Sequence, residues 1–228
     1  MYQEFIYRPL FNLTVAIYNT LPVADLGLAI ITMTVIIRLA LSPLSRRALV
    51  LQRKMSLLTP RMNEIREKFK SDQRAQSEAL TQLYKQEGIN PLWGCVPLLI
   101  QIPIIFALYR VFSAVSKGGD LNLLYSFISN PIHISATFLH IVDLSQPSHV
   151  LAILAGALQF MQARQTIQKP QGPSTGGIAE AMNTQMLYFF PAMIIIISWR
   201  FPAGLSLYWV TTTAFSIVEQ LYIRKTMK

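Results

Sequence analysis

The chain has 228 residues, of which 52% are hydrophobic and 14% are charged, whereas charged residues make up about a quarter of an ordinary soluble domain. Its net charge of +9 lies in segments between apolar stretches, which argues against a nucleic-acid-binding protein. The single cysteine, Cys95, excludes an internal disulfide, and no histidine or cysteine cluster has the spacing of a metal site. With a mean hydropathy of +0.39, this composition predicts an all-α polytopic membrane protein without a cofactor.

Residues 1–24 predict an amphipathic helix that lies in the membrane interface. Apolar residues recur at helical spacing and polar residues fall on the other side. The apolar set is Phe5, Ile6, Leu10, Leu13 and Ile17, and the polar set is Glu4, Arg8 and Asn12. A short lead-in to the first membrane span is the alternative interpretation.

Residues 25–44 contain the first predicted transmembrane helix, Leu26 to Leu44, and Arg38 lies inside it. A charge in the hydrocarbon region costs from about 2.5 to more than 10 kcal/mol, depending on how far water and headgroups follow it. Arg38 lies closer to Arg46 than to Asp25, and therefore in the half of the bilayer nearer to Arg46. We predict that it faces a hydrated pocket; the alternative is a side chain that extends to the nearer headgroups.

Residues 45–90 predict an antiparallel helical hairpin on the cytoplasmic side. Apolar residues repeat at spacings of three and four, which is typical of an amphipathic helix. They are Met55, Leu58, Met62, Ile65 and Phe69. Residues 70–72 predict a turn with a helix cap, and a second helix continues to about Gln86, where Gly88 ends it. A solvated basic loop is the alternative.

Residues 91–223 hold four further predicted spans. They are about 91–115, 148–163, 186–199 and 203–223. The third of these has only 14 residues between Gln185 and Arg200. At ~1.5 Å per residue it covers roughly 21 Å, whereas the hydrocarbon core is about 30 Å thick. We therefore expect a locally thinned bilayer around the protein.

The loop charges predict the orientation of the five spans. Fifteen Lys and Arg residues fall on one side, ten of them between residues 45 and 90 and three in the short basic tail 224–228. The other side has Arg8, Lys117 and Arg200, with Arg110 near it. Because cytoplasmic loops carry the excess of positive charge, the N-terminus is predicted outside and the C-terminus inside.

Every predicted span except the fourth places polar side chains at mid-depth. They include Thr34, Gln101, Gln159, Gln162, Ser206, Thr211, Thr212, Thr213, Ser216, Glu219 and Gln220. Each alone is typical of a hydrogen bond between membrane helices, but together they can solvate an arginine. No nucleophile with a base, zinc-protease motif or P-loop accompanies them, so the sequence predicts a protein that is not an enzyme.

Three segments resemble the YidC family of membrane protein insertases, which includes the mitochondrial Oxa and thylakoid Albino proteins. They read GLAIITMTVIIRLALSPL, YKQEGINPLWGCVPLLIQIPIIFALYRVF and MLYFFPAMIIIISWRFPAGLSLYWVTTTAFSIVEQ, and with the hairpin they cover most of residues 25–223. The resemblance implies a five-helix core whose groove opens to the cytoplasm and to lipid, with Arg38 as the groove arginine. It also implies that Trp209 faces the groove; packing within the bundle is the alternative. The additional first span and large periplasmic domain of the long family form are not seen.

The residues and the resemblance together predict a membrane protein insertase and chaperone of the bacterial inner membrane, which works without nucleotide hydrolysis. The predicted substrate-binding residues are Thr34, Arg38, Gln101, Gln159, Tyr208, Trp209 and Thr212. Predicted partners are nascent membrane proteins and membrane lipids, to which the family adds the Sec translocon, the ribosome and targeting components. Two alternatives stay open. One is an ion or solute channel that uses Arg38 as an anion site, and the other is an assembly factor for membrane complexes.

Overall fold

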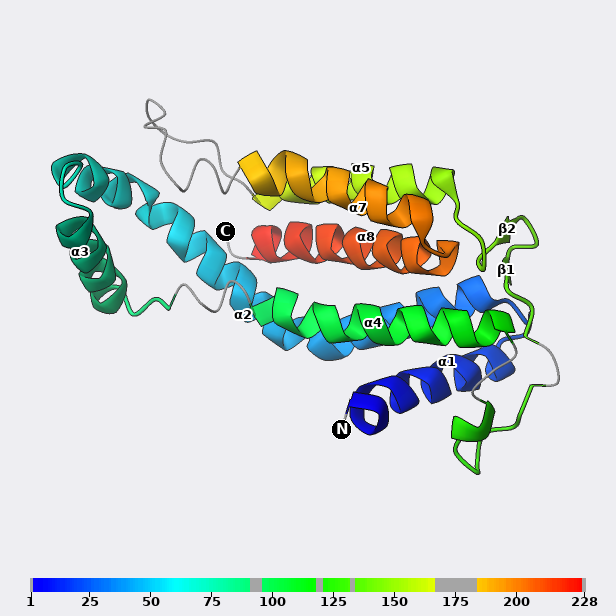
Figure 1. Cartoon of the computed structure of the whole chain (residues 1–228). Helices are drawn as coiled ribbons and strands as arrows, with labels where there is room; N and C mark the ends of the chain where they lie inside the picture. Colours follow the sequence, from blue (N-terminus) through cyan, green and yellow to red (C-terminus); the bar gives the residue numbers. More distant parts are fainter. Residues whose placement is uncertain (1, 91–95, 118–120, 132–133, 167–183, 227–228) are drawn as a thin grey trace.

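The structure, a computed structural model, is a bundle of helices with a small β-ladder at one end (Figure 1). It describes residues 2–90, 96–117, 121–131, 134–166 and 184–226. In chain order the elements are η1 (Gln3–Tyr7), α1 (Arg8–Thr20), α2 (Leu26–Lys68), α3 (Gln73–Gln86), α4 (Val96–Lys117), η3 (Leu121–Leu123), β1 (Thr137–Phe138), β2 (Val142–Asp143), α5 (His149–Thr166), η4 (Gln185–Phe189), α7 (Phe190–Arg200) and α8 (Ala203–Thr226). The predicted all-α class is confirmed, since the two strands have two residues each.

Helix α2 is one helix of 43 residues, and it runs through the predicted boundary between residues 44 and 45. Asp25 caps its start, where the carboxylate accepts a 2.9 Å hydrogen bond from the amide of Leu28. Pro43 and Pro60 lie inside the helix. A proline removes one backbone donor and often ends a helix, but here the helix continues on both sides of each proline. The predicted boundary is therefore not a helix end.

One described helix segment, Leu26–Met55 of α2, is both long and apolar enough to cross a membrane by itself. Gln101–Ala114 and Gln185–Arg200 are shorter apolar helices. The other predicted spans overlap helices α4, α5, η4 with α7, and α8, and residues 91–95 of the predicted span 91–115 lie outside the described residues. The number of membrane crossings stays a prediction.

Helix α8 lies at the centre of the bundle. It packs against α2, α4, α5 and α7, with α5 and α7 on one side and α2 and α4 on the other (Figure 1). Its first turns are enclosed, and Leu205 and Leu207 share one core with Ile30 of α2 and Phe112 of α4. A central helix with neighbours on several sides can bring its side chains together with those of α2 and α4.

The N-terminal helix packs most of the predicted apolar side against the core, together with further residues outside the predicted set. Tyr7, Phe11 and Val15 are buried in the core against α2 and α4, whereas Phe5 is 76% exposed. Asn12, predicted on the polar side, is only 1% exposed. The assignment of Phe5 and Asn12 was wrong because the neighbouring helices and the loop 121–147 select the buried face, and hydropathy alone does not contain that information.

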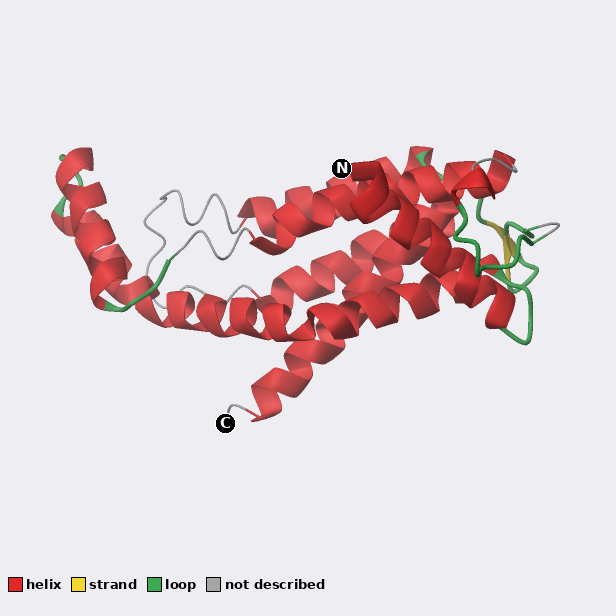
Figure 2. Cartoon of the chain, turned by 90° about the horizontal axis from the view of Figure 1, so that it is seen from below, coloured by secondary structure: helices red, strands yellow, loops and turns green. Residues whose placement is uncertain are grey.

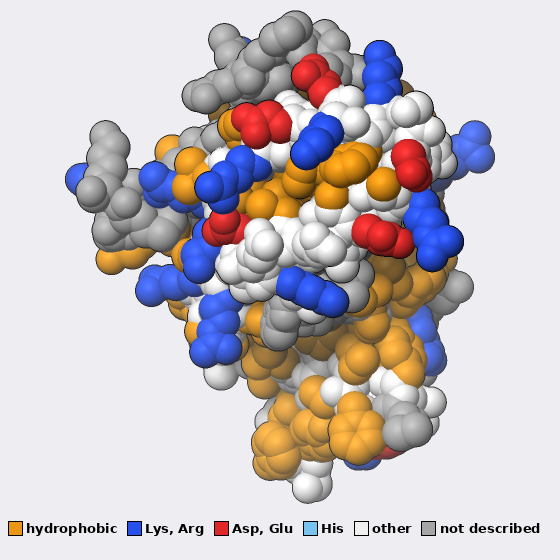
Figure 3. Space-filling model, turned by 90° about the vertical axis from the view of Figure 1, so that its left-hand side faces the viewer, with side chains coloured by type: hydrophobic (Ala, Val, Ile, Leu, Met, Phe, Trp, Pro, Cys, Tyr) orange, Lys and Arg blue, Asp and Glu red, His pale blue; other side chains and the backbone are white. Residues whose placement is uncertain are grey.

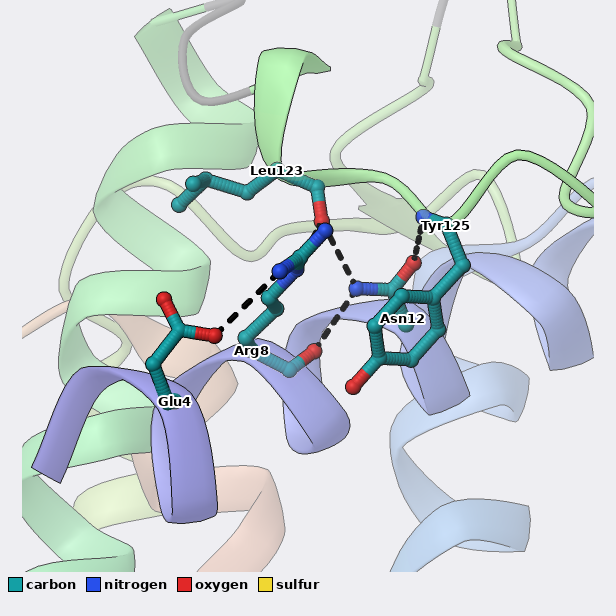
Figure 4. A network of polar contacts seen from close by, with 5 residues as sticks. All are labelled: Glu4, Arg8, Asn12, Leu123 and Tyr125. Atoms are coloured by element: carbon teal, nitrogen blue, oxygen red, sulfur yellow. Dashed lines mark hydrogen bonds and ion pairs between the residues drawn. The ribbon is translucent and has the colours of Figure 1, made fainter. Parts of the chain in front are cut away.

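Asn12 is buried because the loop after α4 satisfies its amide (Figure 4). Its Nδ2 donates to the carbonyls of Arg8 at 2.8 Å and Leu123 at 3.0 Å, and its Oδ1 accepts from the amide of Tyr125 at 2.7 Å. Arg8 adds a 3.1 Å bond to the Leu123 carbonyl and an ion pair with Glu4 at 3.2 Å. The network fixes the loop onto α1.

The rest of this loop closes one end of the bundle. The amide of Leu139 donates to the Asp25 carboxylate at 2.6 Å, and the amide of Ser135 donates to the Tyr18 hydroxyl at 3.1 Å. At the start of α8, the amide of Ala203 donates to the carbonyl of Gln146 at 2.8 Å. The loop therefore connects the beginnings of α2 and α8.

The last turns of α2 and helix α3 form a packed unit that projects from the bundle (Figure 2). Its buried cluster consists of Leu58, Met62, Leu83 and Ile89. Asp72 caps α3 by accepting 3.0 Å bonds from the amides of Arg74 and Ala75, and Gly88 follows the helix at φ 62, a conformation that favours glycine. Short-range periodicity and capping residues explain this unit without reference to the bundle.

Candidate functional site

One face of α8 carries a stripe of buried polar side chains. Tyr208, Thr212, Ser216 and Glu219 follow one another at steps of four, four and three residues, which places them on one side of a helix. Their exposed fractions range from 3% to 9%. Since buried polar groups without partners are costly, this stripe depends on side chains from the neighbouring helices.

Arg38 of α2 meets the stripe. Its Nε donates to Oγ1 of Thr212 over 3.4 Å, and its side chain is half-buried. The Tyr208 phenol and the Glu219 carboxylate also act on it electrostatically. The three ion pairs in the described part of the chain all lie elsewhere. Arg38 is therefore a half-buried cation whose hydrogen bond goes to a neutral hydroxyl.

Gln101 of α4 brings a third helix to the site. Its Nε2 donates to the hydroxyl of Tyr208, one turn before Thr212 on α8. Arg38, Gln101, Tyr208 and Thr212 thus come together from α2, α4 and α8. These are four of the seven residues that the sequence predicts as substrate-binding.

The other three predicted residues lie apart from this contact. Gln159 of α5 accepts a 3.5 Å bond from Thr213, the neighbour of Thr212 on α8. Thr34 is 1% exposed and donates to the Ile30 carbonyl of its own helix at 2.6 Å. Trp209 is 9% exposed and belongs to the hydrophobic core. Their proposed contacts with a substrate stay predictions.

Glu219 belongs to the site, although the predicted set leaves it out. It lies on the same face of α8 as Tyr208 and Thr212, and its carboxylate acts on Arg38. The sequence did contain a signal for it, because the spacing from Thr212 to Glu219 is seven residues, two helical turns.

A separate hollow lies on another face of α4. It has a volume of about 520 Å³ and is lined by Tyr2, Ile102, Pro103, Phe106, Tyr109 and Arg110. Arg110 stacks over the ring of Tyr7 at 4.5 Å from its centroid. The lining is almost wholly apolar and Gln101 is not part of it, so the hollow is distinct from the Arg38 site.

The outer faces of the bundle expose large apolar side chains. On α4 they include Leu99 and Phe106, on η4 and α7 Tyr188, Phe189 and Ile196, on α5 Val150 and Ile153, and on α8 Val218 and Leu221. Extended exposed apolar surface marks contact with a membrane or with another protein. The bundle therefore combines an apolar outside with a polar contact between its inner helices.

Comparison with known proteins places these features in a family. The family model described as 60Kd inner membrane protein matches residues 17–228. A relative from Fusobacterium nucleatum subsp. nucleatum, named Membrane protein insertase YidC, is 32% identical over 97% of this chain and 98% of its own length. A relative of the same name from Wolinella succinogenes is 34% identical over 98% of this chain.

A solved structure has the same fold over nearly all of the chain. It is described as an active YidC insertase crystal structure with the first transmembrane domain resolved, and it matches with a TM-score of 0.64 and 25% identity over 95% of this chain. The chain spans 45% of that protein and 38% of the Wolinella relative. It corresponds to the whole of the short relative and to less than half of the long ones.

Proposed function

Because the chain belongs to the YidC family of membrane protein insertases, we propose that it inserts nascent membrane proteins into the bacterial inner membrane and helps them to fold. The observation that carries the proposal is the contact of Arg38 with Thr212, beside the Gln101–Tyr208 bond. A cation attracts an acidic segment, and the neutral hydrogen-bonding groups beside it replace part of the water that the segment loses.

In the proposed first step, an acidic external segment of the substrate enters a groove from the cytoplasm and approaches Arg38. The attraction is strong because the surroundings of the site are largely apolar. Thr212, Tyr208 and Gln101 offer hydroxyl and amide groups along the same face. The polar segment therefore crosses the apolar region in stages.

In the proposed second step, the apolar helix of the substrate leaves for the lipid along the exposed faces of α4 and α7. Leu99, Phe106 and Ile196 expose 62% to 65% of their surface on these helices. At ~25 cal/mol per Å² of apolar area, transfer of one transmembrane helix releases tens of kcal/mol. This release can drive the reaction without nucleotide hydrolysis.

The proposed topology has five crossings, formed by α2, α4, α5, η4 with α7, and α8, with the N-terminus outside and the C-terminus inside. The loop that closes the bundle end then lies outside, and the groove opens inside. The segment Gln185–Arg200 is shorter than the roughly 20 residues of an ordinary crossing, which supports a thinned bilayer beside it.

The unit formed by α3 and the end of α2 is proposed to receive substrates and targeting components in the cytoplasm. Seen from this end, lysine and arginine side chains surround a strip of hydrophobic side chains, with acidic groups between them (Figure 3). In the same unit, Leu57 of α2 is 68% exposed. A mixed surface of this kind suits a transient contact with another protein.

Insertion by the purified chain tests the proposed function. The chain is reconstituted into liposomes and supplied with a single-span substrate whose N-terminal tail is acidic. We expect the tail to become protected from external protease, and empty liposomes to give only the background level. Equal protection in both samples contradicts the proposal, and ion conductance without protection favours a channel.

A further inference from the structure

Glu219 is an acidic side chain inside the bundle, and the proposed insertion steps give it no role. Only 9% of its surface is exposed. Its Oε1 is buried and has no hydrogen-bond partner among the described residues. A buried carboxylate is costly unless it is paired or protonated, so its position requires an electrostatic explanation.

Two contacts between α2 and α8 define the level at which Glu219 lies. Arg38 reaches Thr212, and further along both helices the Arg46 guanidinium lies 5.8 Å from the ring centroid of Tyr222. Glu219 lies between Thr212 and Tyr222 on α8, and therefore between the levels of the two arginines. Arg46 and Tyr222 are both exposed, whereas Glu219 and Thr212 are buried.

Arg38, which is half-buried and bonded to the buried Thr212, is thus the cation that faces the buried side of α8 on which Glu219 lies. The neighbouring residue Gln220 turns to α5, where it accepts a 3.4 Å bond from Thr166. This part of α8 therefore has neutral polar contacts with α5 and faces the cation of α2 on its other side. The carboxylate and the guanidinium attract each other but form no ion pair within the described part of the chain. Such a carboxylate offsets the charge and leaves the guanidinium free to bind another group.

We propose that Glu219 is the internal counter-ion of Arg38, and that an acidic residue of an incoming substrate takes its place. The inference rests on the proposed insertase function and adds a residue that determines specificity. Glu219 lowers the affinity of the empty site for any single anion, including lipid phosphate. Segments with several acidic residues compete with it best.

Binding measurements separate this role from a structural one. The chain in nanodiscs is titrated with a fluorescent peptide that has one apolar span and an acidic tail, and with a second peptide whose tail acids are replaced by Asn and Gln. We expect Glu219→Gln to bind the acidic peptide more tightly, on the order of tenfold, because the charge that partly neutralises Arg38 is removed. The neutral peptide should bind as before.

Three variants complete the experiment. Asp143→Asn removes the same charge from an exposed position of β2 and should change nothing. Glu219→Asp keeps the charge and should not show the gain. In an Arg38→Ala background, Glu219→Gln should lose most of its effect, because the carboxylate then has no cation to offset.

The outcomes distinguish this inference from the proposed function. If Arg38→Ala weakens binding of the acidic peptide but Glu219→Gln leaves it unchanged, the counter-ion role is wrong and the insertase proposal stands. The counter-ion role is also wrong if Glu219→Asp gives the same gain as Gln. If Arg38→Ala binds the acidic peptide as well as the parent does, the attraction step itself fails.

Discussion

Arg38 is the residue on which the proposed chemistry depends most. We expect Arg38→Ala to lower insertion of a substrate with an acidic tail by roughly tenfold, since a charge that attracts the tail at low dielectric is lost. Arg38→Lys should keep most of the activity because the positive charge remains. Protease protection of the tail in liposomes measures both effects.

The matched control for this experiment is Arg46→Ala. Arg46 lies on the same helix and also approaches α8, but it is exposed and its contact is the ring of Tyr222. Water screens its charge, so its loss should change insertion little. Equal losses at both positions would show that the total positive charge of α2 matters, and not the buried site.

Asn12 has a structural role that is just as specific. Asn12→Ala removes two donated hydrogen bonds and one accepted bond, and it leaves the carbonyl of Leu123 and the amide of Tyr125, both in half-buried residues, with fewer partners. We expect a loss of roughly 2 to 3 kcal/mol in the free energy of unfolding. Thermal unfolding in detergent measures it.

Asn19→Ala is the control for this position. Asn19 makes one 2.7 Å bond to the carbonyl of Ser129, and it is exposed. Water can replace its amide, so the substitution should lower the unfolding temperature much less. A similar loss at both positions would mean that burial of Asn12 contributes nothing of its own.

The sequence predicts site residues well where a polar residue is unusual within an apolar segment. Arg38, Gln101 and Thr212 stand out inside apolar runs, and the structure brings them together with Tyr208. The same reasoning cannot exclude Gln159 from the site, although Gln159 contacts Thr213 on a neighbouring face of α8. Rotation of each helix about its axis depends on packing with its neighbours, which a hydropathy pattern does not specify.

At the scale of elements, the predicted helices agree with the structure because apolar periodicity and composition are local properties. Helix α8 begins at Ala203 as predicted, and α3 ends just before Gly88. The boundary after Leu44 has no counterpart because α2 continues beyond Pro43. The position where a chain leaves the membrane and the position where a helix ends can differ. A change of polarity along the sequence marks only the first.

The packing of α5 on α7 depends on one glycine. A Cβ added to Gly156 would lie 2.3 Å from Cγ1 of Ile195, so the two helices approach too closely for a side chain there. We expect Gly156→Leu to separate α5 from α7 at a cost of about 1 to 3 kcal/mol or more. Thermal unfolding and the yield of folded protein measure the change.

Ala157→Leu supplies the matched control, since the next residue of α5 is exposed and a larger apolar side chain there meets no neighbour in the bundle. It should leave the unfolding temperature almost unchanged. Equal destabilisation by both substitutions would point to an effect of leucine on α5 itself, and not to its contact with α7.

For the whole molecule, the two ends of the bundle differ in kind. One end is closed by the loop that bonds to Asn12, Tyr18 and Asp25 and to the start of α8. The other end carries the projecting unit of α2 and α3. Predicting the closure from sequence was not possible, because its bonds join residues far apart in the sequence through backbone groups that every sequence has.

This asymmetry leads to a prediction about topology. Positive loop charge on the side of α3 predicts that this end lies in the cytoplasm and that the closed end faces outside. After Cys95→Ser, single cysteines at Ser71 and Ser126, both exposed, should react with a membrane-impermeant thiol reagent from opposite sides. Ser126→Cys should label in intact spheroplasts, and Ser71→Cys only in inverted vesicles. Labelling of both from one side would contradict five crossings. It would also place the closed end and the unit of α2 and α3 in the same compartment, and the proposed path from cytoplasm to lipid could then not exist.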